Sequence, residues 1–87
     1  MTGFVYILKS ASDGKTYVGS TNNLDRRLKQ HNSGRVKSTK YKIPLKVLFV
    51  EEFATLSEAR KREVWWKSGA GRDKLKEYFV GLLKQQK

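Results

Sequence analysis

Residues 17–31 constrain the fold of this chain more than any other part of the sequence. They read as a strand that runs directly into a helix, in which Leu24 and Leu28 recur at helical spacing. Arg27 and His31 fall on the same helical face, so this stripe is expected to turn towards the protein body. An ionisable group that is turned inward loses solvation free energy unless it finds a partner. The segment therefore predicts a site that contains an arginine and a histidine.

A hairpin is expected just before this helix. Residues 4–8 form a continuous apolar run typical of a buried strand, and residues 16–19 read as its return strand. Asp13-Gly14, between the two runs, is a strong hairpin-turn signal. Such a hairpin can place Tyr6 beside Tyr17, so two tyrosines would join the predicted site.

The first helix has recognisable end signals. Thr21 or Asn22 is expected to cap it, because a side-chain oxygen there can accept from a free backbone N–H group. The helix should end near Asn32, with Gly34 as a stop. A further buried strand is predicted at residues 47–50.

Two more helices are expected in the C-terminal part of the chain. A capping-box pattern begins at Thr55, and the helix that it starts should run to about Lys67. Residues 69–71 contain two glycines and are expected to break this helix, so the last helix would begin near Asp73. Its apolar residues at core spacing are Leu75, Phe79, Leu82 and Leu83. The order β-β-α-β-α-α predicts a single α/β domain over residues 1–87, in which a small sheet packs against helices.

The charge balance points to a polyanionic partner. The 87 residues carry 19 Lys and Arg against 8 Asp and Glu, a formal net charge of +11. Nucleic acid is the commonest partner of so basic a surface, and charge alone does not separate DNA from RNA. Residues 35–46 contain no acidic residue, and the expected nucleic-acid contacts are their basic members Arg35, Lys37, Lys40 and Lys42. Binding of this kind depends strongly on salt.

Composition also narrows the chemistry and the compartment. The chain has no cysteine and one histidine, which excludes thiolate sites and multi-histidine zinc clusters. Any metal would then be a hard cation held by oxygen, such as magnesium or manganese. No apolar run approaches the ~18 residues of a membrane span and no signal peptide is recognised, so a cytoplasmic protein without membrane contact is expected.

Glu63 is a second inward-turned ionisable residue. It falls within an apolar stripe on the second predicted helix, formed by Leu56, Ala59 and Trp66 at steps of three and four. Its carboxylate has two plausible uses, which the pattern leaves open. One is a divalent metal ion, and the other is an ion pair with Arg60, Lys67 or Arg27.

Each candidate residue has an ordinary structural explanation as well. Tyrosine favours strands, which would account for Tyr6 and Tyr17. A histidine in the last turn of a helix interacts favourably with the helix dipole. Gly19 would permit close approach of a helix to the strand. The combination is therefore more informative than any one member.

That combination resembles the GIY-YIG nuclease family. Tyr6 in Val5-Tyr6 is followed eleven residues later by Tyr17-Val18-Gly19, then by the helix with Arg27 and His31, and finally by Glu63. The resemblance runs from about residue 3 to residue 80 and is strongest to small single-domain bacterial members, similar to the nuclease domain of the bacterial repair excinuclease. It implies three antiparallel strands flanked by helices.

The resemblance also implies an activity, namely metal-dependent endonucleolytic hydrolysis of DNA phosphodiesters with one Mg²⁺ or Mn²⁺ ion. Glu63 would hold the ion, and Arg27 would neutralise the phosphate as charge develops. Tyr6 would be the general base for the attacking water. Tyr17 and His31 would position the water, the phosphate or the base. Selectivity for DNA structure, in repair or recombination, is the expected setting.

The sequence departs from the family pattern at several points. Phe4-Val5 precedes Tyr6 where the family has Gly-Ile, and Val18 replaces an isoleucine. Some relatives carry a late asparagine in the site, whereas this chain has none after Asn32. No appended DNA-recognition domain is expected, so a protein partner could supply specificity, and the oligomeric state is open. A non-catalytic nucleic-acid-binding module on the same fold, with Trp65 available for stacking, is the alternative.

Overall fold

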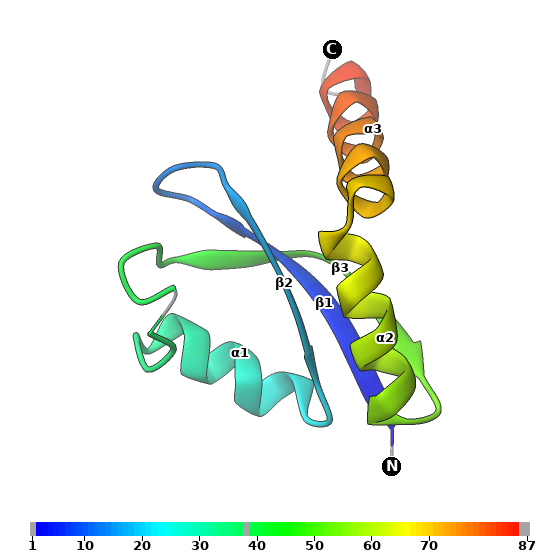
Figure 1. Ribbon diagram of the computed structural model, residues 1–87. Coiled ribbons are helices and arrows are strands. Elements are labelled where there is room, and N and C mark those ends of the chain that lie inside the picture. Colours follow the sequence, from blue (N-terminus) through cyan, green and yellow to red (C-terminus); the bar gives the residue numbers. More distant parts are fainter. Residues whose placement is uncertain (1, 38, 86–87) are drawn as a thin grey trace.

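The computed structural model describes residues 2–37 and 39–85, with side chains as far as residue 77 (Figure 1). The strands are β1 (Gly3–Ser10), β2 (Thr16–Thr21) and β3 (Leu45–Phe53), and the helices are α1 (Leu24–Asn32), α2 (Leu56–Lys67) and α3 (Gly69–Gln85). The strands form one sheet in the order β2-β1-β3, with both pairings antiparallel. The predicted α/β fold with the order β-β-α-β-α-α is confirmed.

The central strand β1 supplies side chains to both faces of the sheet, because successive residues of a strand point in opposite directions. Val5 and Ile7 are fully buried against α2, in a core with Ala59 and Trp66. The alternate residues Tyr6 and Leu8 pack on the other face, where the residues around them include Tyr17, Leu24, Leu28 and Leu45. The helices α1 and α2 therefore cover opposite faces of the sheet (Figure 1).

Asn23 caps α1, so the expectation of Thr21 or Asn22 is wrong by one or two residues. The Asn23 side chain accepts a hydrogen bond from the backbone N–H of Arg26 at 3.1 Å. Thr21 is unavailable as a cap because it still belongs to β2, where it pairs with Phe4. The end of the helix is as expected, at Asn32, with Gly34 beyond it at a φ of 79°.

The junction between α2 and α3 differs from the prediction. Thr55 caps α2 as expected, but α3 already begins at Gly69 and not near Asp73. The break lies at Ser68, whose backbone is extended. Gly71 is needed for close packing and not for a break, because a Cβ atom there would lie 2.3 Å from the Trp65 carbonyl oxygen and 2.4 Å from the Trp66 Cα.

The last helix extends from the end of α2 away from the sheet (Figure 1). Leu75 is buried in the core on the α2 side of the sheet, as its spacing predicted. The other predicted core residues of this helix, Phe79, Leu82 and Leu83, lie outside the residues whose side chains are described. Within the described part of the chain, no helix has the length and apolar character needed to cross a membrane.

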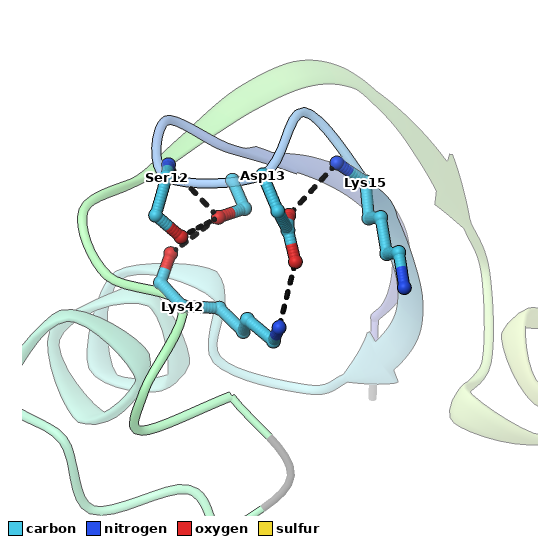
Figure 2. A network of polar contacts seen from close by, with 5 residues as sticks. Ser12, Asp13, Lys15 and Lys42 are labelled. Carbon is cyan, nitrogen blue, oxygen red and sulfur yellow. Dashed lines mark hydrogen bonds and ion pairs between the residues drawn. The ribbon is translucent and has the colours of Figure 1, made fainter.

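A polar network ties the β1–β2 hairpin to the basic connection of residues 35–46 (Figure 2). The Asp13 carboxylate accepts from the backbone N–H of Lys15 at 2.9 Å and pairs with the Lys42 ammonium at 2.7 Å. The buried Ser10 hydroxyl donates to the Lys42 carbonyl at 2.7 Å. The hydrogen bond from Lys42, with that from the Lys15 backbone, lowers the pKa of Asp13 to about 2. The connection is thus anchored at one point before it enters β3.

Candidate active site

A cavity of about 660 Å³ opens beside β2, the strand at one edge of the sheet. Its lining includes all five residues that the sequence singled out for chemistry, namely Tyr6, Tyr17, Arg27, His31 and Glu63. They come from β1, β2, α1 and α2. Only the tertiary structure brings these four elements to one place.

Gly19 allows the Tyr6 side chain to reach this edge. The two residues are direct partners in the β1–β2 pairing. A Cβ atom at Gly19 would lie 2.4 Å from the Tyr6 hydroxyl oxygen, so the phenol ring passes over the glycine. The close neighbour of Gly19 is therefore a tyrosine side chain, and the expectation of a helix against it is wrong. Tyr17 pairs with Leu8 and lies on the same face as Tyr6, diagonally across the hairpin.

Tyr6, His31 and Thr39 form a chain of hydrogen bonds. The Tyr6 hydroxyl lies 3.0 Å from His31 Nε2, and the Thr39 hydroxyl lies 2.9 Å from His31 Nδ1. All three residues are buried, with 2%, 5% and 1% of their surfaces exposed, respectively. Arg27 adds a longer contact, since its Nε–H donates to the Tyr6 hydroxyl at 3.4 Å.

His31 is held in its neutral form. Burial lowers the pKa of its imidazole below the ordinary value, and repulsion from the Arg27 guanidinium lowers it further. A favourable interaction of a charged imidazole with the α1 dipole therefore does not explain this residue at neutral pH. Both ring nitrogens instead face hydroxyl groups.

Glu63 reaches the cavity from α2, on the other side of β2. One carboxylate oxygen accepts a hydrogen bond from the Ser20 hydroxyl, and the other lies 2.6 Å from the Lys67 ammonium. Burial by itself raises the pKa of Glu63, but the hydrogen bonds from Lys67 and Ser20 outweigh it and the pKa lies below its ordinary value. The carboxylate is therefore ionised at neutral pH, and the ion pair with Lys67 that the sequence allowed is present.

The cavity joins the two faces of the sheet around its free edge. Tyr6, Arg27 and His31 lie on the α1 side, whereas Ser20 alternates with Gly19 and contacts Glu63 of α2. An internal strand would have a neighbour in this position, which would separate the two faces. Because β2 lies at the edge of the sheet, the residues on the α1 side and those on the α2 side line the same cavity.

The charges of the lining favour an anionic ligand. Arg27, Lys67 and Arg72 line the cavity, against one carboxylate, Glu63, among the described lining residues. The described part of the chain also contains no cluster of three or more histidine, cysteine or acidic side chains. Mg²⁺ commonly uses only one or two protein carboxylates and completes its shell with water and substrate phosphate. An ionised, partly exposed Glu63 fits that role, in which a cation would compete with Lys67 for the carboxylate.

Comparison with known proteins identifies the family. The model described as "GIY-YIG catalytic domain" matches residues 2–77. This chain belongs to the GIY-YIG nuclease family. A UPF0213 protein of Bacillus licheniformis is 39% identical over 72 residues, which cover 82% of this chain and 73% of that protein. A UPF0213 protein of Clostridium perfringens is 40% identical over 84 residues, which cover 95% of this chain and 89% of that protein.

A solved structure supports the same assignment. The solution NMR structure of a UPF0213 protein from Bacillus halodurans is similar to this GIY-YIG chain with a TM-score of 0.55 and 36% sequence identity. The similarity covers 94% of this chain and 85% of that one. The resemblance inferred from the tyrosines, the α1 face and Glu63 is thereby confirmed at the level of the family.

The basic connection of this GIY-YIG protein lies next to the cavity. Arg35, Lys37 and Lys40 are exposed, whereas the Lys42 ammonium is paired with Asp13. The connection contributes Val36 and Thr39 to the cavity lining, but none of its four predicted nucleic-acid contacts is among the described lining residues. Arg35, Lys37, Lys40 and Lys42 therefore remain predicted contacts for a substrate that extends beyond the cavity.

Sequence reasoning missed two hydroxyl groups of the site, those of Ser20 and Thr39. Ser20 follows directly after the Tyr17-Val18-Gly19 motif, and strand alternation could have placed it opposite Gly19 and towards α2. Thr39 lies in an irregular connection without periodicity, so no pattern in the sequence marks it. Its position next to His31 is a property of the folded chain alone.

Proposed function

We propose that this GIY-YIG protein is a metal-dependent DNA endonuclease, selective for DNA structure and active in repair or recombination. The supporting observation is a single cavity that holds Tyr6, Arg27 and His31 on one side of an edge strand and Glu63 on the other. The excess of positive charge in the lining suits a phosphodiester, which carries one negative charge. Action on DNA would place the protein in the cytoplasm.

Tyr6 is the general base in this proposal. A free phenol loses its proton only near a pH of ~10, so Tyr6 needs a proton acceptor and a neighbouring positive charge. Nε2 of the neutral His31 lies 3.0 Å from the Tyr6 hydroxyl, and the Arg27 Nε–H group lies 3.4 Å away. The Tyr6 O–H bond breaks as an Nε2–H bond forms, and Arg27 stabilises the resulting phenolate.

The phenolate then accepts a proton from water, whose oxygen attacks phosphorus. The bond from phosphorus to the leaving oxygen breaks, and that oxygen takes a proton from solvent while His31 returns its proton to solvent. Arg27 is placed to stabilise the negative charge that develops on the phosphate. Tyr17, on the same face as Tyr6, contributes a hydroxyl that positions the water or the phosphate.

Glu63 is the residue that would hold the metal. A bound Mg²⁺ or Mn²⁺ ion supplies an acidified water molecule or stabilisation of the leaving oxygen. The Ser20 hydroxyl fixes one carboxylate oxygen of Glu63, which orients the group towards the cavity. Lys67 pairs with the same carboxylate, so a bound cation would have to displace the Lys67 ammonium.

The basic connection is the proposed nucleic-acid contact outside the cavity. Arg35, Lys37 and Lys40 present exposed charges, and Tyr41 is 81% exposed beside them, available for stacking. Phosphate contacts of this type hold the substrate without reading its sequence. A protein partner is the expected source of further specificity.

The deciding experiment measures cutting of duplex, single-stranded and branched DNA by the purified protein in Mg²⁺, in Mn²⁺ and in EDTA. Glu63→Gln should abolish cutting, because it removes the charge that holds the metal. Glu58→Gln is the matched control, since Glu58 is an exposed carboxylate on the same helix and outside the described cavity lining. Tyr6→Phe should lower kcat by roughly 10²–10⁴. Cutting that persists in EDTA and in Glu63→Gln would contradict the proposal.

The second candidate is a non-catalytic nucleic-acid-binding module. The observation that favours it is the Glu63–Lys67 ion pair, which leaves the carboxylate neutralised by the protein itself. This function predicts salt-dependent DNA or RNA binding without cutting of any substrate in either metal. Binding that survives both Glu63→Gln and Tyr6→Phe, with no product on any DNA, would replace the endonuclease by this module.

A further inference from the structure

We propose that Thr39 is a positioning residue that stabilises the Nδ1–H tautomer of His31. In this arrangement the Thr39 hydroxyl accepts a hydrogen bond from Nδ1–H, so that Nε2 presents its lone pair to Tyr6. The catalytic consequence rests on the proposed nuclease function, but the tautomer itself does not.

The geometry leaves two arrangements for the imidazole. A neutral imidazole has one N–H donor and one acceptor nitrogen. Both nitrogens of His31 face hydroxyl groups, Tyr6 at 3.0 Å and Thr39 at 2.9 Å. A hydroxyl can donate or accept, so either the Tyr6 hydroxyl donates to Nε2 or the Thr39 hydroxyl donates to Nδ1.

Arg27 favours the first arrangement. Its Nε–H group can only donate, and it points at the Tyr6 hydroxyl oxygen. That oxygen therefore already accepts one hydrogen bond, and its own proton needs an acceptor, which His31 Nε2 provides. In the other tautomer both Arg27 and His31 would donate N–H groups to the Tyr6 oxygen. The Tyr6 proton would then have no acceptor among the described side chains that hydrogen-bond to it.

Backbone hydrogen bonds hold Thr39 beside His31, where its hydroxyl can accept from Nδ1–H. Its backbone N–H donates to the Val36 carbonyl at 3.0 Å, and its own carbonyl accepts from the Lys42 N–H at 2.8 Å. Lys42 is in turn fixed by the Asp13 carboxylate and the buried Ser10 hydroxyl (Figure 2). The hairpin tip thus holds, through Lys42, the turn that presents the Thr39 hydroxyl to His31.

A hydroxyl is well suited to this place. Thr39 is 1% exposed, so water does not compete for Nδ1. Its oxygen can accept from Nδ1–H both in the neutral imidazole and in the imidazolium that forms when His31 takes the Tyr6 proton. The proton is therefore taken up at Nε2 with no rearrangement at Nδ1.

The single histidine makes the tautomer directly measurable. Ring ¹⁵N chemical shifts of the intact protein, recorded near pH ~8, where a histidine with an ordinary or lowered pKa is neutral, report His31 alone. The wild type should carry its proton on Nδ1. Thr39→Val, which removes the acceptor and keeps the shape, should move both shifts towards a mixture of tautomers, whereas Thr39→Ser should keep the wild-type pattern. Thr16→Val makes the same chemical change elsewhere in the cavity lining and should leave both shifts unchanged.

Kinetics test the catalytic consequence separately. Thr39→Val should lower kcat about tenfold with KM for DNA unchanged, and Thr39→Ser should restore most of it, because the buried hydroxyl acts through His31. A wild-type ring protonated on Nε2, or shifts that do not change in Thr39→Val, would overturn the proposal. The wild-type spectrum decides the tautomer even if Thr39→Val does not fold, and it does so whether or not the protein cuts DNA.

Discussion

Two inward-turned residues, His31 and Glu63, differ in their charge at neutral pH. His31 is neutral, because burial and the neighbouring Arg27 both disfavour its protonated form. Glu63 is charged, because Lys67 and Ser20 compensate for its partial burial. The difference follows from their partners and not from the depth of burial alone. A neutral proton acceptor and an ionised carboxylate are what the proposed reaction needs from these two residues.

The charge state of His31 predicts a pH dependence. Its pKa in the folded protein lies below the ordinary 6.5. Cleavage should therefore be insensitive to this group above pH 6.5 and should fall as the pH drops through the lowered value. The free energy of unfolding should decline as the pH falls from 6.5 to that lowered value, since the unfolded chain binds the proton more readily between the two. A histidine NMR titration with a midpoint at or above 6.5 would contradict this prediction.

Gly19 predicts a second effect at the scale of single residues. A Cβ atom in Gly19→Ala would lie 2.4 Å from the Tyr6 hydroxyl and 2.5 Å from its Cζ atom, so the buried ring must move. The substitution should cost roughly 1–3 kcal/mol of stability, as measured by denaturant unfolding. It should also lower kcat by displacing Tyr6 from His31.

A double-mutant cycle isolates the cause. In a Tyr6→Leu background the same Gly19→Ala substitution should cost much less, because the ring that it strikes is gone. An equal cost in both backgrounds would mean that Gly19 is required for some reason other than the passage of Tyr6.

At the scale of elements, strand order and helix junctions decide where the site forms. The edge position of β2 lets side chains from both faces of the sheet meet in one cavity. The helix α3 follows α2 closely enough that Arg72 and Leu75 close one wall of that cavity. Gly71 permits this approach because its Cα lies against the backbone of Trp65 and Trp66.

Two glycines of α3 therefore predict opposite outcomes. Gly71→Ala should destabilise the protein by roughly 1–3 kcal/mol, since the added methyl group meets backbone that has little freedom to move. Gly69→Ala is the matched control, because nothing lies within 4 Å of its Cβ position. It should be neutral or stabilising by up to about 1 kcal/mol, since alanine has the higher helix propensity. Thermal or denaturant unfolding of the two variants measures the contrast, and equal stabilities would refute the packing role of Gly71.

At the scale of the whole molecule, the net charge of +11 is the dominant property. Arg27, Lys67 and Arg72 are the basic residues of the described cavity lining, so most of the 19 basic residues lie outside it. The exposed part of the connection, with Arg35, Lys37 and Lys40, lies beside the cavity that would receive the scissile phosphate. This arrangement suits a substrate that is longer than one nucleotide.

Salt dependence measures the contribution of the connection. The logarithm of the DNA-binding constant should fall linearly with the logarithm of the salt concentration, with a slope of about 0.9 per neutralised phosphate. Neutralising Arg35, Lys37 and Lys40 together to glutamine should reduce the slope by up to about 3. A control that neutralises Lys61, Lys74 and Lys76 removes the same charge from exposed positions of α2 and α3 and should change the slope less. Equal changes in the two variants would show that only total charge matters.

Much of the fold was predictable because it depends on local patterns. The apolar run of β1, the Asp13-Gly14 turn and the Thr55 cap each predicted their elements from neighbouring residues alone. The errors have local causes too. Thr21 belongs to β2, so Asn23 caps α1 instead. The glycines of residues 69–71 predicted a helix break, whereas they lie in α3 and Gly71 allows close contact with α2. A glycine that prevents a clash and a glycine that ends a helix look the same in a sequence.

The sequence by itself determined the α/β class, the family and the inward direction of Arg27, His31 and Glu63. Helical and strand periodicities predicted the class and the inward direction, because they arise within each element, whereas the three antiparallel strands were implied by the resemblance to the family. Only the tertiary structure decided that Tyr6 passes over Gly19 and that Thr39 meets His31. These contacts join residues from different segments, whose relative placement no local pattern specifies, whereas the Glu63–Lys67 pair has the i,i+4 spacing of a single helix. Glu63 reaches the same cavity as Tyr6 only because β2 lies at the free edge of the sheet.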